Sequence, residues 1–221
     1  MCGRFALDQE LDDLISAFVV EHNRFPDWAP RWNIAPTTMI PLVIDSADGR
    51  SLGPARWSLT PSWSDTLDGP YPTFNARSET AATKPTFRAA VARHRGIIPA
   101  TAYYEWRTAE GIKTPHVIRP SDGSLFAFAG LYSIWAKGDQ PVVTATILTR
   151  DAPESLSQIH PRSPVPLPHD AWEWWLDPER VGDESLVRRA VESSQTLLES
   201  ATAYPVAPLR GDGPDLLRPL D

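Results

Sequence analysis

The spacing of apolar residues predicts helices near both ends of the chain. Between positions 8 and 19 they recur at the i, i+3, i+4, i+7 spacing of one helix face, so we expect a helix there. The residues on this face are Leu11, Leu14, Ile15 and Phe18. Further helices are expected at 78–95, just after Pro153, at 171–176 and at 184–198.

Short apolar and β-branched segments, separated by turn residues, predict a sheet between these helices. Gly111 and the run Ser121-Asp122-Gly123 are turn signals between the later segments. Strands in succession with helices grouped at the start and end indicate an α+β fold. We expect one domain over 1–221, with a mostly antiparallel, barrel-like β-sheet core and flanking helices. The expected strands are 41–45, 55–59, 97–107, 114–119, 125–135, 142–149 and 203–207.

Two segments carry helix and loop signals of their own. Ser78 is expected to cap a helix, with Glu79 in the first turn, where a carboxylate stabilises the helix dipole. Pro85 is expected to interrupt this helix because it has no N–H to donate, and Gly96 to end it. The segment 26–36 contains three prolines and is expected to be irregular.

Composition indicates a folded soluble protein, with 42% hydrophobic and 22% charged residues in 221. No apolar stretch approaches the ~20 residues of a membrane span, and the N-terminus does not resemble a signal peptide. We therefore expect a cytoplasmic protein. The single cysteine, Cys2, excludes an intramolecular disulfide and a cysteine-based zinc cluster. We expect no metal and no cofactor.

The negative charge is concentrated in the last quarter of the chain. The net charge is −7, yet 169–221 holds 11 acidic and 5 basic residues while 1–168 holds 17 and 16. We expect 169–221 to be an acidic helical cover. Between 75 and 96 bases predominate, which fits a solvated helix face or a local nucleic-acid surface; composition alone favours the first. These bases are Arg77, Lys84, Arg88, Arg93 and Arg95.

Cys2 becomes an N-terminal aminothiol if Met1 is removed. An α-amine has an ordinary pKa of about 7.7–8.0 and a cysteine thiol about 8.5, so both have usable deprotonated fractions near neutral pH. The amine can condense with an aldehyde to an imine, and the sulfur can then close a five-membered thiazolidine. Taken alone, a lone cysteine is more often an inert small hydrophobe.

Four other residues are candidates for chemistry or binding. Glu105 lies between aromatic residues, where burial would raise its pKa and let it move protons. His160 suits acid–base work, and Asn33 can orient a reacting group through its amide. Trp63 lies in a turn-rich loop and can stack on bases. Each has a structural alternative: an ion-paired glutamate, a packed histidine, a turn asparagine or a core tryptophan.

No phosphate-binding loop, dinucleotide fingerprint, H-E-x-x-H or G-x-S-x-G motif occurs. Instead, several segments together resemble the SOS response-associated peptidase (SRAP) family, the abasic-site processing proteins. The resemblance is strongest over 1–168. Its segments are MCGRF at 1–5, RWNIAPT at 31–37, RWSLTPSW at 56–63, NARSET at 75–80, KPTFR at 84–88, IIPA and YYEW across 97–106, FAFAGLY at 126–132 and the segment around His160.

The resemblance implies residue roles and a substrate. Cys2 corresponds to the cysteine that links covalently to the opened sugar of an abasic site. Asn33, Glu105 and His160 correspond to three assisting polar residues. Around His160 the family usually reads H-D-R-M-P, and this chain reads H-P-R-S-P. The implied DNA contacts are Arg4, Trp63, Arg77, Lys84, Arg88 and Thr149.

We therefore expect abasic sites in single-stranded DNA to be captured as a thiazolidine crosslink through Cys2 after Met1 is removed, which protects the lesion. The family also implies peptidase activity on its own N-terminus, and the imine would allow weak lyase activity. One alternative is an N-terminal-nucleophile cysteine amidase or peptidase with other substrates. Another is a non-covalent single-stranded DNA binder. We expect a monomer that associates with the replication machinery, and with the nucleoid when DNA is bound.

Overall fold

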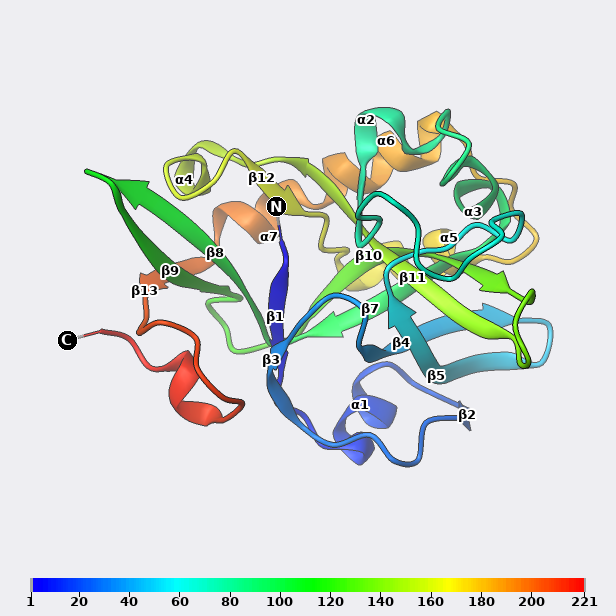
Figure 1. Cartoon of the computed structure of the whole chain (residues 1–221), viewed down its shortest axis with the longest axis horizontal. Coiled ribbons are helices and arrows are strands. Elements are labelled where there is room, and N and C mark those ends of the chain that lie inside the picture. The colour runs from blue at the N-terminus through cyan, green and yellow to red at the C-terminus, as the bar shows by residue number, and fades with distance from the viewer. Residues whose placement is uncertain (1, 221) are drawn as a thin grey trace.

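The computed structural model describes residues 2–220 and is built on a closed five-stranded barrel (Figure 1). Strand β11 (Val142–Asp151) pairs antiparallel with β10 (Phe126–Trp135) and parallel with β5 (Gly49–Trp57). From β10, pairing continues through β7 (Arg95–Ala100) and β4 (Met39–Ser46) to β5, which closes the ring. The predicted α+β fold with a mostly antiparallel, barrel-like core is confirmed.

A second sheet holds the N-terminal strand in its interior. Its order is β13 (Thr202–Pro205), β9 (Ile112–Arg119), β8 (Ala102–Ala109), β1 (Arg4–Leu7) and β3 (Arg31–Ile34). Strand β1 pairs antiparallel with β8 on one side and β3 on the other. The expectation that 26–36 is irregular is therefore wrong for β3, which long-range pairing orders although local signals do not mark it.

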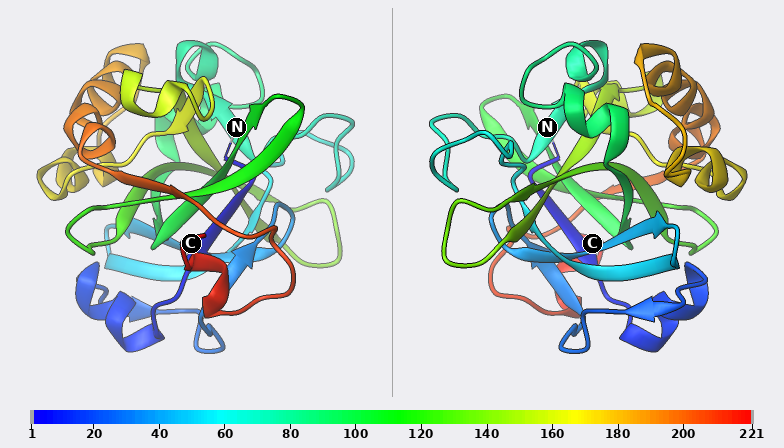
Figure 2. Two further views of the ribbon diagram at one scale, coloured as in Figure 1. Left: turned by 90° about the vertical axis from the view of Figure 1, so that its left-hand side faces the viewer. Right: turned by 90° about the vertical axis from the view of Figure 1, so that its right-hand side faces the viewer.

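The helices surround the two sheets, with α5–α7 gathered on one side and α1 at one end (Figures 1 and 2), while the short strands β2 and β12 extend the barrel sheet and β6 pairs with β11. Helix α5 contacts β7 and helix α6 contacts α2, so the acidic C-terminal segment packs on the barrel. Within the described chain, no helix combines the length and apolar character needed to span a membrane. The elements are β2 (His22–Asn23), β6 (Asn75–Arg77), β12 (Arg162–Pro164), α1 (Leu11–Ala17), α2 (Ser78–Ala81), α3 (Arg88–Arg93), α4 (Glu154–Ser157), α5 (Trp172–Leu176), α6 (Glu184–Ser193), α7 (Gln195–Glu199) and the 3₁₀ helices η1 (His169–Ala171) and η2 (Pro214–Leu217).

The strand expected over 97–107 is two strands in different sheets, β7 and β8. The break is at Thr101, whose N–H donates to the Ala6 carbonyl at 2.8 Å and whose hydroxyl donates to Asp8 at 2.5 Å. Both strands are largely buried, so the apolar pattern runs through the break without marking it.

The interruption expected at Pro85 is confirmed, because α2 ends before it and α3 begins after it. The capping role expected of Ser78 is wrong: it is the first residue of α2, and Arg77 occupies the N-cap position without a side-chain cap. Gly96 does not end the helix either, since it lies inside β7. A Cβ on Gly96 would lie 2.8 Å from Leu42 Cδ1, so close packing of β4 requires the glycine.

Aromatic side chains connect the N-terminal strand to the barrel interior. Trp57 of β5 is fully buried and meets Phe5 of β1 edge-on, with ring centroids 5.0 Å apart. Its indole N–H donates to the Phe74 carbonyl at 2.8 Å, which satisfies the one polar group that burial would leave unpaired. Strand β1 is thus fixed by packing as well as by its ladder.

Arg95 is a structural arginine and does not belong to a basic surface. Its side chain is buried, and the guanidinium donates to five main-chain carbonyls at 2.7–3.0 Å. The five acceptors are Val91, Ala92, Trp175, Asp177 and Arg180, so one cation connects α3 to the segment after α5.

Replacing Arg95 with Met should lower the free energy of unfolding by about 3 kcal/mol, because buried carbonyls would lose their donors. The exposed neighbour Arg93→Met is the matched control and should change it by no more than about 0.5 kcal/mol. Urea unfolding followed by tryptophan fluorescence measures both, and equal stability of the two variants would contradict the structural role of Arg95.

Candidate active site

Cys2 lies two residues before β1, on the side where the ladder of β1 with β8 leads toward Glu105. The register pairs Arg4 with Tyr104 and Phe5 with Tyr103, and one further step brings Gly3 opposite Glu105. The Cys2 side chain is completely buried. The N-terminal sequence is therefore built into the sheet, and the thiol is presented to the inside of the site.

Asn75 holds the main chain of Cys2. Its side-chain Nδ2 donates to the Cys2 carbonyl at 2.8 Å, and its Oδ1 is buried without a hydrogen-bond partner among the described residues. Asn75 begins β6, and alternation along that strand puts Ala76 inside and Arg77 on the same side as Asn75. Arg77 is exposed, so the strand that holds Cys2 through Asn75 also presents a cation at the surface two residues further on.

Glu105 and His160 form a pair beside the cysteine. The Glu105 side chain is 6% exposed and that of His160 27%, and Glu105 Oε2 lies 3.8 Å from His160 Nδ1. His160 comes from the segment between α4 and β12, whereas Glu105 comes from β8. The two groups offer a path for protons from solvent to the buried thiol.

The thiol is held in its protonated form. Burial raises the pKa of the Cys2 thiol well above its ordinary value, and the negative charge of Glu105 raises it further. The sequence expectation of a usable thiolate near neutral pH concerns Cys2 after removal of Met1, and for that state it stays a prediction. Glu105 is the carboxylate whose charge reaches the thiol.

Asn33, one of the three expected assisting residues, lies elsewhere. Its Oδ1 accepts from Arg4 Nη1 at 2.8 Å, and its Nδ2 donates to the Gly211 carbonyl at 2.7 Å. Its main-chain N–H donates to Asp212 at 3.0 Å. Asn33 therefore ties the C-terminal segment to β3, and Asn75 is the asparagine that contacts Cys2. The missed signal was in N-A-R-S-E-T itself, where Asn75 and Arg77 share one face of a strand.

Most expected DNA contacts lie on the surface. The Trp63 side chain is 62% exposed, while Lys84 and Arg88 are exposed around α3. Two side chains fix the main chain of the Trp63 loop. Lys137 Nζ donates to the Trp63 carbonyl at 2.9 Å, and Trp135 Nε1 donates to the Ser64 carbonyl at 2.9 Å. An exposed indole on a fixed loop is suited to stacking.

Thr149 is not a surface contact, and Arg4 is already engaged by Asn33. The Thr149 side chain is fully buried, and its hydroxyl donates to the Ala76 carbonyl at 3.3 Å. The Thr149 side chain is covered because β11 pairs with β12 on one side of it and with β6 on the other, and its expected contact with DNA stays a prediction. Among the residues from 2 to 220, no cluster of three or more His, Cys, Asp or Glu residues is arranged to hold a metal.

The sequence matches the family described as SOS response associated peptidase (SRAP) over residues 1–209. It is 38% identical over 190 residues to the abasic site processing protein YoaM of Bacillus subtilis (strain 168), which covers 84% of this chain and 83% of that protein. The abasic site processing protein YedK of Escherichia coli (strain K12) is 32% identical over the same length, with 84% and 83% covered. HMCES of Gallus gallus, another abasic site processing protein, is 28% identical over 265 aligned positions that cover all of this chain and 78% of HMCES.

The fold agrees with these matches. A crystal structure of a protein from Bacteroides thetaiotaomicron superposes with a TM-score of 0.85 at 22% identity, covering 99% of this chain and 100% of the other. With a family match over nearly the whole length and relatives above 30% identity across most of it, the chain belongs to the SOS response associated peptidase family.

Proposed function

We propose that this protein recognises abasic sites in single-stranded DNA and links itself to them through Cys2. The surroundings of Cys2 carry this proposal: its main chain is held by Asn75 at 2.8 Å, the charge of Glu105 reaches the thiol, and His160 pairs with Glu105. The relatives YoaM, YedK and HMCES are named abasic site processing proteins, which supports extending that activity to this chain.

The chemistry begins with removal of Met1, which gives Cys2 a free α-amine. The amine attacks the aldehyde carbon of the ring-opened sugar, and loss of water gives an imine. The sulfur then adds to the imine carbon, and the nitrogen takes up a proton, which closes the thiazolidine. Glu105 takes the thiol proton during this addition and His160 assists at the sugar oxygen. The product is a stable crosslink that shields the lesion.

The exposed groups near the site suit a single strand. Arg77 would bind a backbone phosphate next to the lesion, and Trp63 would stack on a base. Lys84 and Arg88 extend the same positive surface. The protein thus binds the DNA backbone independently of sequence. It selects the lesion by reacting covalently with the aldehyde, which an intact nucleotide lacks.

Two further activities follow from the same groups. Removal of Met1 by the protein's own site would be a peptidase step, and an imine to the opened sugar would permit β-elimination and strand cleavage as a minor lyase reaction. The peptidase step needs the Cys2 thiol and should disappear with the crosslink in Cys2→Ala, whereas the lyase step needs only the α-amine, which that variant keeps.

Incubation with a single-stranded oligonucleotide that contains one abasic site should give a covalent, gel-shifted band. Cys2→Ala should abolish the band, and an oligonucleotide without the lesion is the control. The intact mass of the purified protein should show that Met1 is absent. A band that persists in Cys2→Ala would contradict the proposal, and amide turnover without any band would favour an amidase.

Asn75→Ala should slow crosslinking by about 10- to 100-fold, because the Cys2 main chain would lose the bond that aligns it with its neighbours. Asn33→Ala is the contrasting variant and should crosslink at nearly the wild-type rate. It loses the hydrogen bond to Gly211, so the C-terminal segment of the protein would be held less firmly against β3. Single-turnover rates at saturating DNA measure both. A slower rate for Asn33→Ala than for Asn75→Ala would contradict this assignment.

Alkylation of Cys2 by iodoacetamide, in protein that retains Met1, should be slow at neutral pH and rise only above the ordinary thiol pKa of about 8.5. Glu105→Gln should move this profile to lower pH, since the negative charge that helps to raise the thiol pKa would be gone. A Cys2 profile like that of an exposed cysteine, unchanged in Glu105→Gln, would refute a protonated thiol.

A further inference from the structure

The main-chain N–H of Arg162 points away from the sheet to which its strand belongs. Ala152 N–H donates to the Pro161 carbonyl and Val165 N–H to the Leu148 carbonyl, both at 2.9 Å. Hydrogen-bonded and non-bonded pairs alternate along an antiparallel ladder, so the pair of Asp151 with Arg162 is a non-bonded one. The Arg162 amide is therefore available to a side chain outside the ladder.

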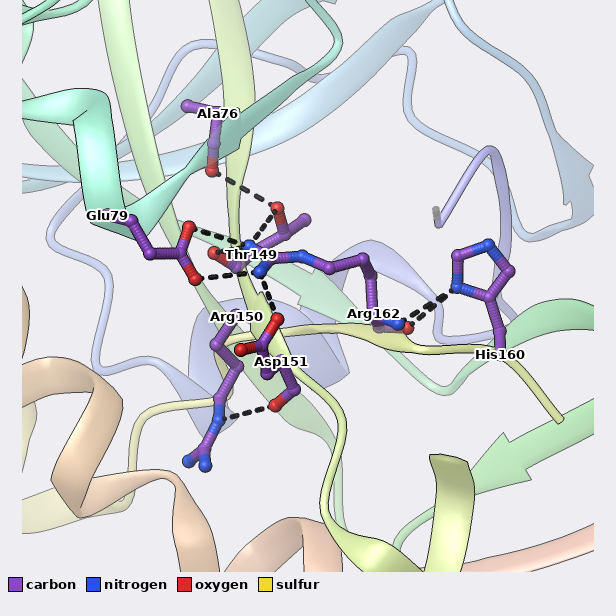
Figure 3. Close-up of polar contacts among 7 residues, drawn as sticks. All are labelled: Ala76, Glu79, Thr149, Arg150, Asp151, His160 and Arg162. Carbon is purple, nitrogen blue, oxygen red and sulfur yellow. Dashed lines mark hydrogen bonds and ion pairs between the residues drawn. The ribbon is translucent and has the colours of Figure 1, made fainter. Parts of the chain in front are cut away.

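That side chain is His160. Arg162 N–H donates to His160 Nδ1 at 3.0 Å, and Figure 3 shows the ring turned toward this main-chain segment. If Nδ1 carried the proton, its N–H would face the Arg162 N–H at 3.0 Å, which is repulsive. The hydrogen bond gained would be a longer one, to the Arg162 carbonyl at 3.3 Å. Glu105 Oε2 also faces Nδ1, but at 3.8 Å it is beyond hydrogen-bond reach. The nearer amide makes Nδ1 an acceptor.

The Arg162 side chain anchors this amide. Glu79 accepts from both Nη1 and Nη2 of Arg162, at 2.7 and 3.0 Å, and Asp151 accepts from Nη1 at 2.6 Å. The Thr149 carbonyl accepts from Nη2 at 2.8 Å (Figure 3). Burial alone would raise the pKa of Glu79, but the hydrogen bonds and charge of Arg162 outweigh it and lower that pKa. The guanidinium thus joins α2 and β11 to the strand that follows His160.

The residue between the ring and the amide is Pro161, where the family pattern usually has Asp. Proline fixes φ near −65°, which leaves the two-residue connection from His160 to Arg162 little freedom. Its carbonyl is also held by Ala152. The ring, the amide and the anchored guanidinium therefore form one rigid unit.

From this geometry we infer that neutral His160 carries its proton on Nε2. Glu79 and Asp151 are positioning residues that hold this tautomer through Arg162. Because the Nδ1 lone pair is occupied by the Arg162 amide, a neutral His160 cannot use it as a base, and Nε2 on the other side of the ring points away from Arg162. The role in crosslinking rests on the proposed function.

Long-range ¹⁵N NMR of the full chain with labelled histidine reads the tautomer directly at about pH 8, where histidine is ordinarily neutral. The chain has five histidines, so His160→Gln assigns the signal by its loss. We expect an unprotonated Nδ1 and a protonated Nε2 in the wild type. A protonated Nδ1 would overturn the inference, and since no DNA is present this result does not depend on crosslinking.

The double variant Glu79→Gln, Asp151→Asn should give a mixture of tautomers and slow single-turnover crosslinking at saturating DNA by about tenfold, part of the 10²- to 10⁴-fold that such groups contribute. The matched control is Glu21→Gln, Asp45→Asn, which removes the two carboxylates that bind Arg50 on the β4–β5 hairpin. It should leave both readouts unchanged. An unmixed tautomer and wild-type rate in the first variant would overturn the positioning role.

Pro161→Gly tests the connection from His160 to Arg162 with both carboxylates intact. It also provides a test of the inference if the double variant does not fold. The exposed proline can be replaced without opening the core. We expect a mixed tautomer and slower crosslinking, with unmodified single-stranded DNA bound as by the wild type. If both readouts stay at their wild-type values, the rigid connection from His160 to Arg162 is not what fixes the ring.

Discussion

The pairing of β1 with β8 is the interaction on which the rest of the site depends. It is only three registered residue pairs long, yet it carries Cys2 to Glu105 and leaves the thiol no contact with solvent. Phe5 reinforces it by packing on Trp57 inside the barrel. Since a shift of one residue would turn every β1 side chain to the opposite face, the position of the cysteine is as firmly specified as the core itself.

Much of the fold could be predicted from local pattern, and the exceptions share one cause. Apolar spacing marks helix α1, and long apolar runs mark the strands β10 and β11, which are buried along most of their length. Local pattern does not mark β1 or β3, which are four residues each and are ordered by partners far along the chain. It also misses the change of sheet at Thr101, since β7 and β8 are both buried. Tertiary pairing decides these places.

The candidate site shows the same division. Taken alone, Cys2, Glu105 and His160 each have a structural alternative, and it is the resemblance to the family that selects them as a set. Asn33 and Asn75 are both asparagines in motifs that the family shares, and nothing local says which one meets the cysteine. The answer depends on β6 lying beside β11, a parallel pairing made across more than seventy residues of chain. The burial of Thr149 could not be predicted from the sequence for a related reason, because the same pairing covers it.

Burial of the thiol changes what kind of cysteine this is. A thiolate next to solvent would be a good general nucleophile and also an easy target for oxidation. Here burial and Glu105 both disfavour the charged form, so the sulfur stays neutral until an electrophile is already in place. A neutral thiol and a neutral imine give a neutral thiazolidine, so the addition changes no net charge. The sulfur bonds to carbon, and in the proposed reaction the thiol proton passes by way of Glu105 to nitrogen. Under the proposed function, a low-dielectric site therefore does not impede thiazolidine closure, and it restricts the cysteine to substrates that the amine has captured first.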